Sequence, residues 1–527
     1  MSESSKLNLT RRSFILGGAA GLVGAGATAA LSGCNRKKGG EGGGSAELTG
    51  AIAYTATDIN PIANTTVLGR SVFWHISEGL YNIDFHTFKT YNGLAALSPT
   101  KVNDYTYDVI LRDNAKFSNG APVTTDDVIK SFKDNMKDEI FGSLLGFIKD
   151  VTAKDSKTVT FTLNYPFENL LEKRLAIVFI YPASMSKDEL KSKPIGSGPW
   201  TLKTFDGNNG GRIEFGKNEY YEGKYAAPTD SMVWDCLLDN TSRTTAITDR
   251  TTLAMESVPD LNTGQITSSG ATVDYVQGFS TCYFMFNCLK PPFNDVRVRQ
   301  AINYAINVQS LIDVQLDGHA TPATSFLPKS HPNYHKASTV YDYDPEKAKQ
   351  LLAEAGQSNL NCVLTINNFW PKNLAPQIQS DLKAVGVNAE LDVKTVQWNT
   401  LAESNSILPY DFMLTPGDPS QICDDVDLLM SFWYGDNAWM NGRSCWKKSA
   451  PEKWNELSNL MQRARESSSA STQQTLWNQC FDIIAENCPL LPFLHRELGT
   501  AYLGDKLSNF KPIATPGLSF LGASASE

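Results

Sequence analysis

The chain has 527 residues, of which 47 are Lys or Arg and 56 are Asp or Glu, so its formal charge is −9. At roughly 150 residues per domain, this length allows several domains with large buried cores. The apolar share of 41% excludes a wholly disordered protein. The acidic balance argues against a nucleic-acid-binding protein, which usually carries a basic excess.

The first 33 residues have the features of an export signal rather than of a fold. Arg11 and Arg12 come directly before an uncharged stretch, rich in Gly and Ala, that runs from Phe14 to Gly33. This pattern is similar to a twin-arginine export signal. Residues 31–34, Leu-Ser-Gly-Cys, resemble a bacterial lipobox, in which the thiol of Cys34 would take the lipid. An uncleaved N-terminal anchor is the alternative, and both interpretations predict a protein held at a membrane outside the cytoplasm.

Residues 34–46 are rich in Gly and predict a flexible tether. Besides Cys34 the chain has eight cysteines, and outside the cytoplasm an even number permits disulfides. We expect one to three bridges, and the pairs closest in sequence are Cys480/Cys488 and Cys423/Cys445. Buried free thiols are the alternative. The cysteine spacing contains no CxxC, so neither a zinc site nor a redox site is predicted.

The body of the chain alternates strand and helix patterns. Period-two alternation predicts strands, and caps with apolar stripes predict helices. The first expected elements are strands at 105–111 and 159–163, a helix from Thr125 to about Lys137, a strand-like run at 281–287, and a helix that Asn294 or Asp295 caps and Gly318 ends. Further elements are a helix from Asp344 to Gly356, a helix at about 375–385, a strand at 387–396, and late helices at about 452–466 and 472–487. This alternation predicts an α/β fold with several sheets.

Patterns that would indicate catalysis are scarce. The sequence contains no GxSxG, no HExxH and no P-loop, and no cofactor is expected. His331 and His335 have helical metal-site spacing, but Pro332 between them favours a surface loop. Ser184 and Lys187 match S-x-x-K, the signature of serine acylases. We find no convincing SDN or KTG partner downstream, so an extracytoplasmic serine acylase stays an alternative and a non-enzyme is the prediction.

Five separated stretches, in order along the chain, resemble one known family. They are Glu-Gly-Leu-Tyr at 78–81, the run from Leu111 to Val128, Pro-Ile-Gly-Ser-Gly-Pro-Trp at 194–200, Phe286-Asn287 with Pro291 to Ala301, and Tyr343 to Leu352. Together they look like the ABC-transporter substrate-binding proteins for oligopeptides and dipeptides (family 5). The region 236–275 departs from that pattern, because the usual Gly-Glu-x-Asp tract is not found there.

The resemblance implies a two-lobed clamshell of the periplasmic-binding-protein-like type (type II, cluster C). Lobe 1 would comprise residues 47–277, with an extra subdomain at about 82–190. Lobe 2 would comprise 278–490, and the C-terminal segment 491–527 would return to lobe 1. Ligand would lie between the lobes, and closure of the lobes would hold it without any covalent step.

The resemblance also implies a set of ligand-binding residues. Asp418 corresponds to the residue that receives the α-ammonium group of a peptide, although Asp418-Pro419 could simply be a turn. Trp398 and Tyr283 correspond to aromatic residues of the pocket, although either could be core. Arg70 falls where lobe 1 meets ligand and could receive a carboxylate. Arg297 and Arg299, by contrast, are expected to hold the fold.

The implied partners follow from the same resemblance. They are a peptide or another small solute, such as a nickel chelate, haem or a sugar, and an ABC permease and ATPase complex. The membrane would be reached through the lipid anchor, the protein would be a monomer, and no metal site is predicted.

Overall fold

The computed structural model describes residues 46–367, 370–395 and 406–526. The predicted signal peptide, Cys34, Trp398 and all of the tether except residue 46 lie outside the described residues. Among the residues that are described, none of the helices combines the length and the hydropathy that a membrane span requires.

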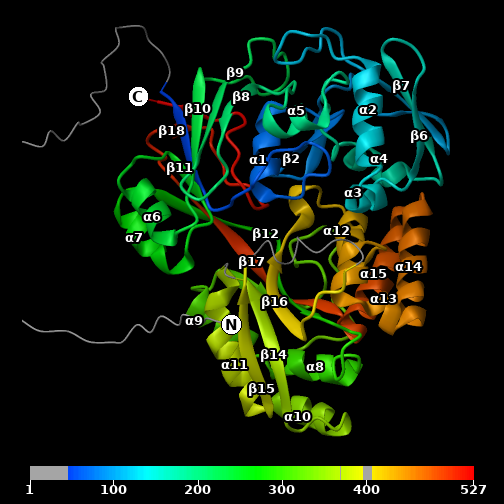
Figure 1. Ribbon diagram of the computed structural model, residues 1–527, viewed down its shortest axis with the longest axis vertical. Coiled ribbons are helices and arrows are strands. Elements are labelled where there is room, and N and C mark those ends of the chain that lie inside the picture. The colour runs from blue at the N-terminus through cyan, green and yellow to red at the C-terminus, as the bar shows by residue number, and fades with distance from the viewer. Residues whose placement is uncertain (1–45, 368–369, 396–405, 527) are drawn as a thin grey trace, which may run out of the picture. The chain divides into compact units, whose positions relative to one another are not determined.

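An 11-stranded sheet runs through the body of the protein (Figure 1). In spatial order it contains β15 (Val387–Lys394), β14 (Leu360–Asn367), β16 (Phe412–Gly417), β12 (Thr272–Phe286), β17 (Leu490–Tyr502), β11 (Ala254–Glu256), β1 (Leu48–Ile52), β10 (Ser231–Cys236), β9 (Arg212–Lys217) and β8 (Trp200–Phe205), with β13 (Ala320–Pro322) paired to β17. Strands β1 and β8–β11 therefore lie on one side of the pair β12–β17, and β14–β16 lie on the other.

The two longest strands, β12 and β17, join these two groups. They pair antiparallel from Thr272 opposite Tyr502 to Met285 opposite Leu490, and the register shifts between Gln277 and Thr281. Gly278 lies in this interruption, and a Cβ at that position would come within 2.1 Å of the Ala514 carbonyl oxygen. The close approach of backbone therefore requires glycine here.

The remaining strands form smaller sheets. Strands β4 (Thr100–Asn103), β5 (Thr106–Ile110), β7 (Thr158–Leu163) and β6 (Ile148–Ala153) form a four-stranded antiparallel sheet. Two-stranded sheets pair β2 (Tyr81–Asp84) with β3 (Lys89–Asn92) and β18 (Leu507–Ser508) with β19 (Ser524–Ala525).

Helices cover both groups of strands. Those up to β12 are α1 (Val67–Ile76), α2 (Thr125–Asn135), α3 (Glu139–Leu144), α4 (Glu168–Leu175), α5 (Lys187–Ser192), α6 (Asn240–Thr248), η1 (Asp260–Asn262) and α7 (Thr263–Ser268). Those after β12 are α8 (Val296–Ala305), α9 (Val308–Gln315), α10 (Pro345–Glu354), η2 (Trp370–Leu374), α11 (Ala375–Ala384), η4 (Pro419–Gln421), α12 (Val426–Tyr434), the π-helix η5 (Trp439–Ser444), α13 (Trp446–Ser449), α14 (Pro451–Glu466) and α15 (Ala470–Asn487). Helices α6 and α7 pack on β1, β11 and β12, while α11 packs on β15 and α15 on β17.

Most of the expected elements are confirmed, and one helix is wrong. The helix expected to run from Asp295 to Gly318 ends at Ala305, because Ile306 is extended. Asn307 then caps a second helix, α9, by accepting a hydrogen bond from the Ser310 N–H at 3.1 Å. Asn is a poor residue for a helix interior because its side chain competes for backbone groups, and it is a favoured cap.

The expectation of one to three disulfides is also wrong. All eight described cysteines are free and buried, which confirms the alternative interpretation. Cys480 lies within α15 and Cys488 caps its C-terminus. Eight residues of helix separate two Cα atoms by about 12 Å, whereas a disulfide needs less than about 7 Å.

Candidate functional site

A cavity of about 290 Å³, here called the central cavity, lies where β12, β16 and β17 meet the chain that follows β1. Its walls come from segments far apart in the sequence. They are Tyr54, Thr55, Thr65, Thr66 and Val67; Ser280 and Tyr283; Asn367; Thr415 to Pro419 and Gln421; Phe432, Trp433 and Trp439; and Arg496, Leu498 and Pro516. Both predicted lobes therefore contribute to it.

Asp418 is the carboxylate of this cavity. It follows β16 and caps η4: Oδ1 accepts a hydrogen bond from the Ser420 N–H and Oδ2 accepts one from the Ser280 N–H, both at 2.9 Å. Burial raises the pKa of Asp418 to about 7, against the lowering effect of those hydrogen bonds. Among the described residues, Asp418 forms no ion pair with a cationic side chain. The carboxylate thus offers a buried charge that a cationic group of a ligand would neutralise.

The cationic side chain among the lining residues, Arg496, already has a partner. Its Nη2 donates to Oδ2 of Asp260 at 2.7 Å and to the Val258 carbonyl oxygen at 3.4 Å. Both members of this ion pair are buried. The charge of Arg496 is thus paired with that of Asp260, whereas Asp418 accepts hydrogen bonds from backbone N–H groups.

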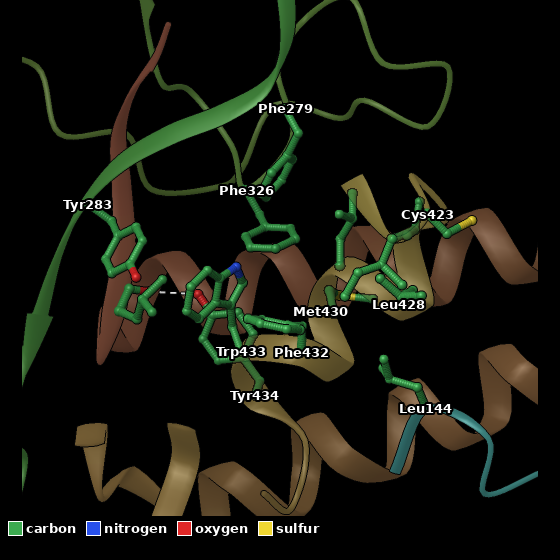
Figure 2. Packing of buried hydrophobic residues seen from close by; sticks show 14 of the residues in the cluster. Leu144, Phe279, Tyr283, Phe326, Cys423, Leu428, Met430, Phe432, Trp433 and Tyr434 are labelled. Atoms are coloured by element: carbon green, nitrogen blue, oxygen red, sulfur yellow. Dashed lines mark hydrogen bonds between the residues drawn. The ribbon is translucent and has the colours of Figure 1, made fainter. Parts of the chain in front are cut away.

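Aromatic rings form the apolar part of the wall. The ring of Tyr283 meets Trp433 edge to face, with centroids 5.0 Å apart, and Trp433 in turn lies 5.0 Å from Trp439 and 4.8 Å from Phe432. Figure 2 shows Tyr283, Trp433 and Phe432 in this packing. Gly417 borders the rings so closely that a Cβ there would lie 2.6 Å from Trp433. Such a wall suits an apolar side chain, and its π-faces also attract cations.

Three buried polar atoms of the wall have no hydrogen-bond partner within the described part of the chain. They are Oδ1 of Asn367, Oε1 of Gln421 and Nε1 of Trp439. The amide nitrogens of both side chains already donate hydrogen bonds. Nδ2 of Asn367 donates to Oγ1 of Thr415, and Nε2 of Gln421 donates to the Thr65 carbonyl oxygen, each at 2.7 Å. A buried acceptor left without a donor costs about 1–3 kcal/mol. A ligand that carries N–H groups would satisfy both amide oxygens.

The end of β16 also offers backbone groups to the cavity. Strand β14 pairs with β16 only as far as Leu414, whereas β12 pairs with it as far as Gly417. The segment Thr415–Gly417 therefore has one ladder partner among the described residues. Pro416 has no N–H, so it contributes only a carbonyl, which again favours donors on the ligand.

The structure brings together two of the residues named from the sequence. Asp418 and Tyr283 both line the central cavity, although Tyr283 is also almost fully buried in the core. Arg70 does not reach it. Arg70 lines a separate cavity of about 30 Å³ with Trp74 and Phe179, and no residue lines both cavities. Trp398 is outside the described residues.

Several cavity residues were missed at the level of the sequence. These residues lie in segments whose apolar or polar patterns also fit ordinary core and turn positions. They are Trp433, Trp439, Asn367 and Gln421. The run Phe432-Trp433-Tyr434, three aromatic residues in succession, was the available signal.

The other motifs have structural roles or exposed positions. Ser184 and Lys187 are solvent-exposed. Arg297 pairs with Asp295 at 2.6 Å and Arg299 donates to the Asn487 carbonyl at 2.7 Å, as expected for residues that hold the fold. Among the described residues no group of three or more His, Cys, Asp or Glu side chains is placed to bind a metal.

Two groups of strands, joined by a pair of long crossing strands around a cavity of solute size, define a two-lobed solute-binding protein. The family model "Bacterial extracellular solute-binding proteins, family 5 Middle" matches residues 90–441. The chain therefore belongs to this family of ABC-transporter binding proteins, and the family resemblance noted from the sequence is confirmed.

Individual relatives agree with this assignment. Glutathione-binding protein GsiB of Escherichia coli O1:K1 / APEC is 28% identical over 66% of this chain and 69% of its own. The ABC transporter-associated periplasmic binding protein DppA of Helicobacter pylori, solved with the peptide STSA, superposes with a TM-score of 0.79 at 21% identity over 92% of this chain and 99% of its own. NikA of Staphylococcus aureus, solved with Ni(L-His)2, gives a TM-score of 0.75 at 20% identity over 91% of this chain and 100% of its own. The relatives are solute-binding proteins and not enzymes.

Proposed function

We propose that this protein captures short peptides outside the cytoplasm and delivers them to an ABC permease and its ATPase. The observation that carries the proposal is the buried Asp418 carboxylate, which lines the central cavity and forms no ion pair with a cationic side chain of the described residues. The α-ammonium group of a peptide supplies the missing charge. The free amide oxygens of Asn367 and Gln421 and the carbonyls at the end of β16 would accept hydrogen bonds from peptide N–H groups.

The size of the cavity favours a ligand of two or three residues. Its 290 Å³ lies at the lower end of the range of about 300–1,000 Å³ in which small-molecule pockets fall. The rings of Tyr283, Trp433 and Trp439 would hold an apolar side chain. A long oligopeptide would need a larger space.

Closure of two lobes is the proposed mechanism. Lobe 1 would comprise 47–277 with the return segment 491–527, and lobe 2 would comprise 278–490. The register shift of β12 and β17 between Gln277 and Thr281 supports a hinge there. Because ligand contacts both lobes only in the closed form, binding shifts the population toward that form.

We further propose that the mature protein is a monomer anchored through lipid on Cys34 after twin-arginine export. The Arg11-Arg12 pair and the Leu-Ser-Gly-Cys sequence support this proposal. Intact mass measurement of the membrane-extracted protein tests it, because lipidated Cys34 would be the N-terminal residue.

Native mass spectrometry of the freshly purified protein tests the ligand class. The proposal predicts bound masses equal to those of dipeptides or tripeptides, lost on denaturation. Bound masses that match a nickel chelate, a haem or a sugar would replace peptides as the solute while leaving the receptor role in place.

A further inference from the structure

Arg70 is a buried cation without a carboxylate partner among the described residues. Its side chain is 2% exposed and lies over the ring of Phe179, with Cζ 4.4 Å from the ring centroid. Nη1 donates to the Ile177 carbonyl oxygen at 3.2 Å, and Nε has no hydrogen-bond partner in the described part of the chain. A guanidinium stays protonated in proteins, and a buried charge without a partner is costly. The surroundings of Arg70 therefore lack a negative charge that would balance its guanidinium.

A second donor faces the same small cavity. Trp74 lies one helical turn after Arg70 in α1, so the two side chains share a face of the helix. Trp74 is 8% exposed, and its Nε1–H also has no acceptor within the described chain. Both residues line the cavity of about 30 Å³ that Phe85 and Phe179 help to enclose. An acceptor bound in this cavity would satisfy both donors.

The described part of the chain does not supply the negative charge. No Asp or Glu from residues 46–367, 370–395 or 406–526 lines this cavity. Cys423 is close enough to Arg70 to affect its pKa, but burial raises the pKa of the Cys423 thiol far above its ordinary value, so the thiol is neutral at pH 7. Burial lowers the pKa of Arg70 to about 9, and the group still remains charged at pH 7. The charge must come from a bound species.

We propose that the cavity beside Arg70 and Trp74 binds a monovalent inorganic anion of the size of chloride. A water needs roughly 10–15 Å³ of such space, so a cavity of about 30 Å³ accommodates one monatomic anion and no peptide. The anion accepts hydrogen bonds from Nε of Arg70 and Nε1 of Trp74, beside the rings of Phe85 and Phe179. The site is separate from the central cavity.

Diffraction from crystals of the protein grown in sodium bromide tests the proposal directly. The expected result is anomalous density within hydrogen-bond distance of Arg70 and Trp74. A cavity without bromide density overturns the proposal, and so does a peptide-bound crystal in which the peptide carboxylate contacts Arg70.

Thermal unfolding provides an independent test in solution. At equal ionic strength, chloride should raise the Tm above its value in sodium gluconate, an anion too large for the cavity, with a saturating shift of about 2 °C. Arg70→Met should abolish the difference, and Arg212→Met, which removes an exposed pair with Asp235, should retain it. Equal Tm values of the unaltered protein in the two salts contradict the proposal. If Arg70→Met does not fold, the bromide crystals decide.

Discussion

Arg174 in α4 and Asp425 at the N-cap of α12 form a buried ion pair with a nitrogen–oxygen distance of 2.8 Å. The same guanidinium reaches Asp427 at 3.0 Å, and Arg465 of α14 approaches the other oxygen of Asp427 at 2.6 Å. Helix α4 belongs to the predicted subdomain of lobe 1, whereas α12 and α14 belong to predicted lobe 2. The cluster therefore joins the two proposed lobes, beside the Lys173–Asp424 pair at 2.7 Å.

Arg174→Met is expected to lower the free energy of unfolding by about 3–5 kcal/mol, because it leaves Asp425 unpaired in a buried site. Urea denaturation at pH 7 measures the loss. Arg212→Met is the matched control and should change the free energy of unfolding by no more than about 1 kcal/mol, since its pair is exposed. Equal losses in the two variants would show that the buried pair is no more important than a surface one.

The affinity for a peptide should fall when the pH drops below about 7 and when it rises above about 8. Burial raises the pKa of Asp418 to about 7 in the ligand-free protein, and an ammonium group binds the ionised carboxylate. Below pH 7 the ligand must displace a proton, so the Kd for leucyl-leucine should rise by up to tenfold per pH unit. Above pH 8 the peptide amine itself loses its proton, because its pKa is about 7.7–8.0. Calorimetry between pH 5.5 and 8.5 should show the tightest binding between these limits, and a Kd that is flat over the acidic range would contradict the role of Asp418.

Gly417→Ala should weaken peptide binding through a steric effect, because it changes no charge and no hydrogen-bonding group. The added methyl would lie 2.6 Å from Trp433 and 2.8 Å from Tyr283, so these rings, which line the central cavity, must shift. We expect at least a tenfold increase in the Kd for leucyl-leucine, measured by calorimetry. Gly264→Ala is the control, because nothing lies within 4 Å of a Cβ at that position in α7. Unchanged affinity in Gly417→Ala would place the ligand elsewhere.

Local structure was largely predictable from the sequence because its causes are local. Asp344 with Pro345 marks the start of α10, and Gly386, at φ 89°, ends the turn between α11 and β15. The break between α8 and α9 was not predicted. The apolar stripe runs across it, and only the capping role of Asn307 shows that the helix stops.

The site was predictable only in part because its residues come together through long-range packing. Asp418 and Tyr283 could be named from a family resemblance. The proximity of Trp433, Asn367 and Arg496 depends on how α12, β14 and β17 pack, and no local pattern encodes it. The position of Arg70 in a different cavity likewise follows from the packing of α1 against Phe179.

In the proposed complex, Asp418 binds the α-ammonium group of a short peptide. Calorimetric titration of leucyl-leucine and N-acetyl-leucyl-leucine into the unaltered protein and into Asp418→Asn tests it most directly, with Asp313→Asn as a control at an exposed carboxylate. We expect acetylation and Asp418→Asn each to raise the Kd at least about thirtyfold, their effects not to be additive, and Asp313→Asn to leave the Kd unchanged. Equal affinities for the free and the acetylated dipeptide in the unaltered protein would contradict it.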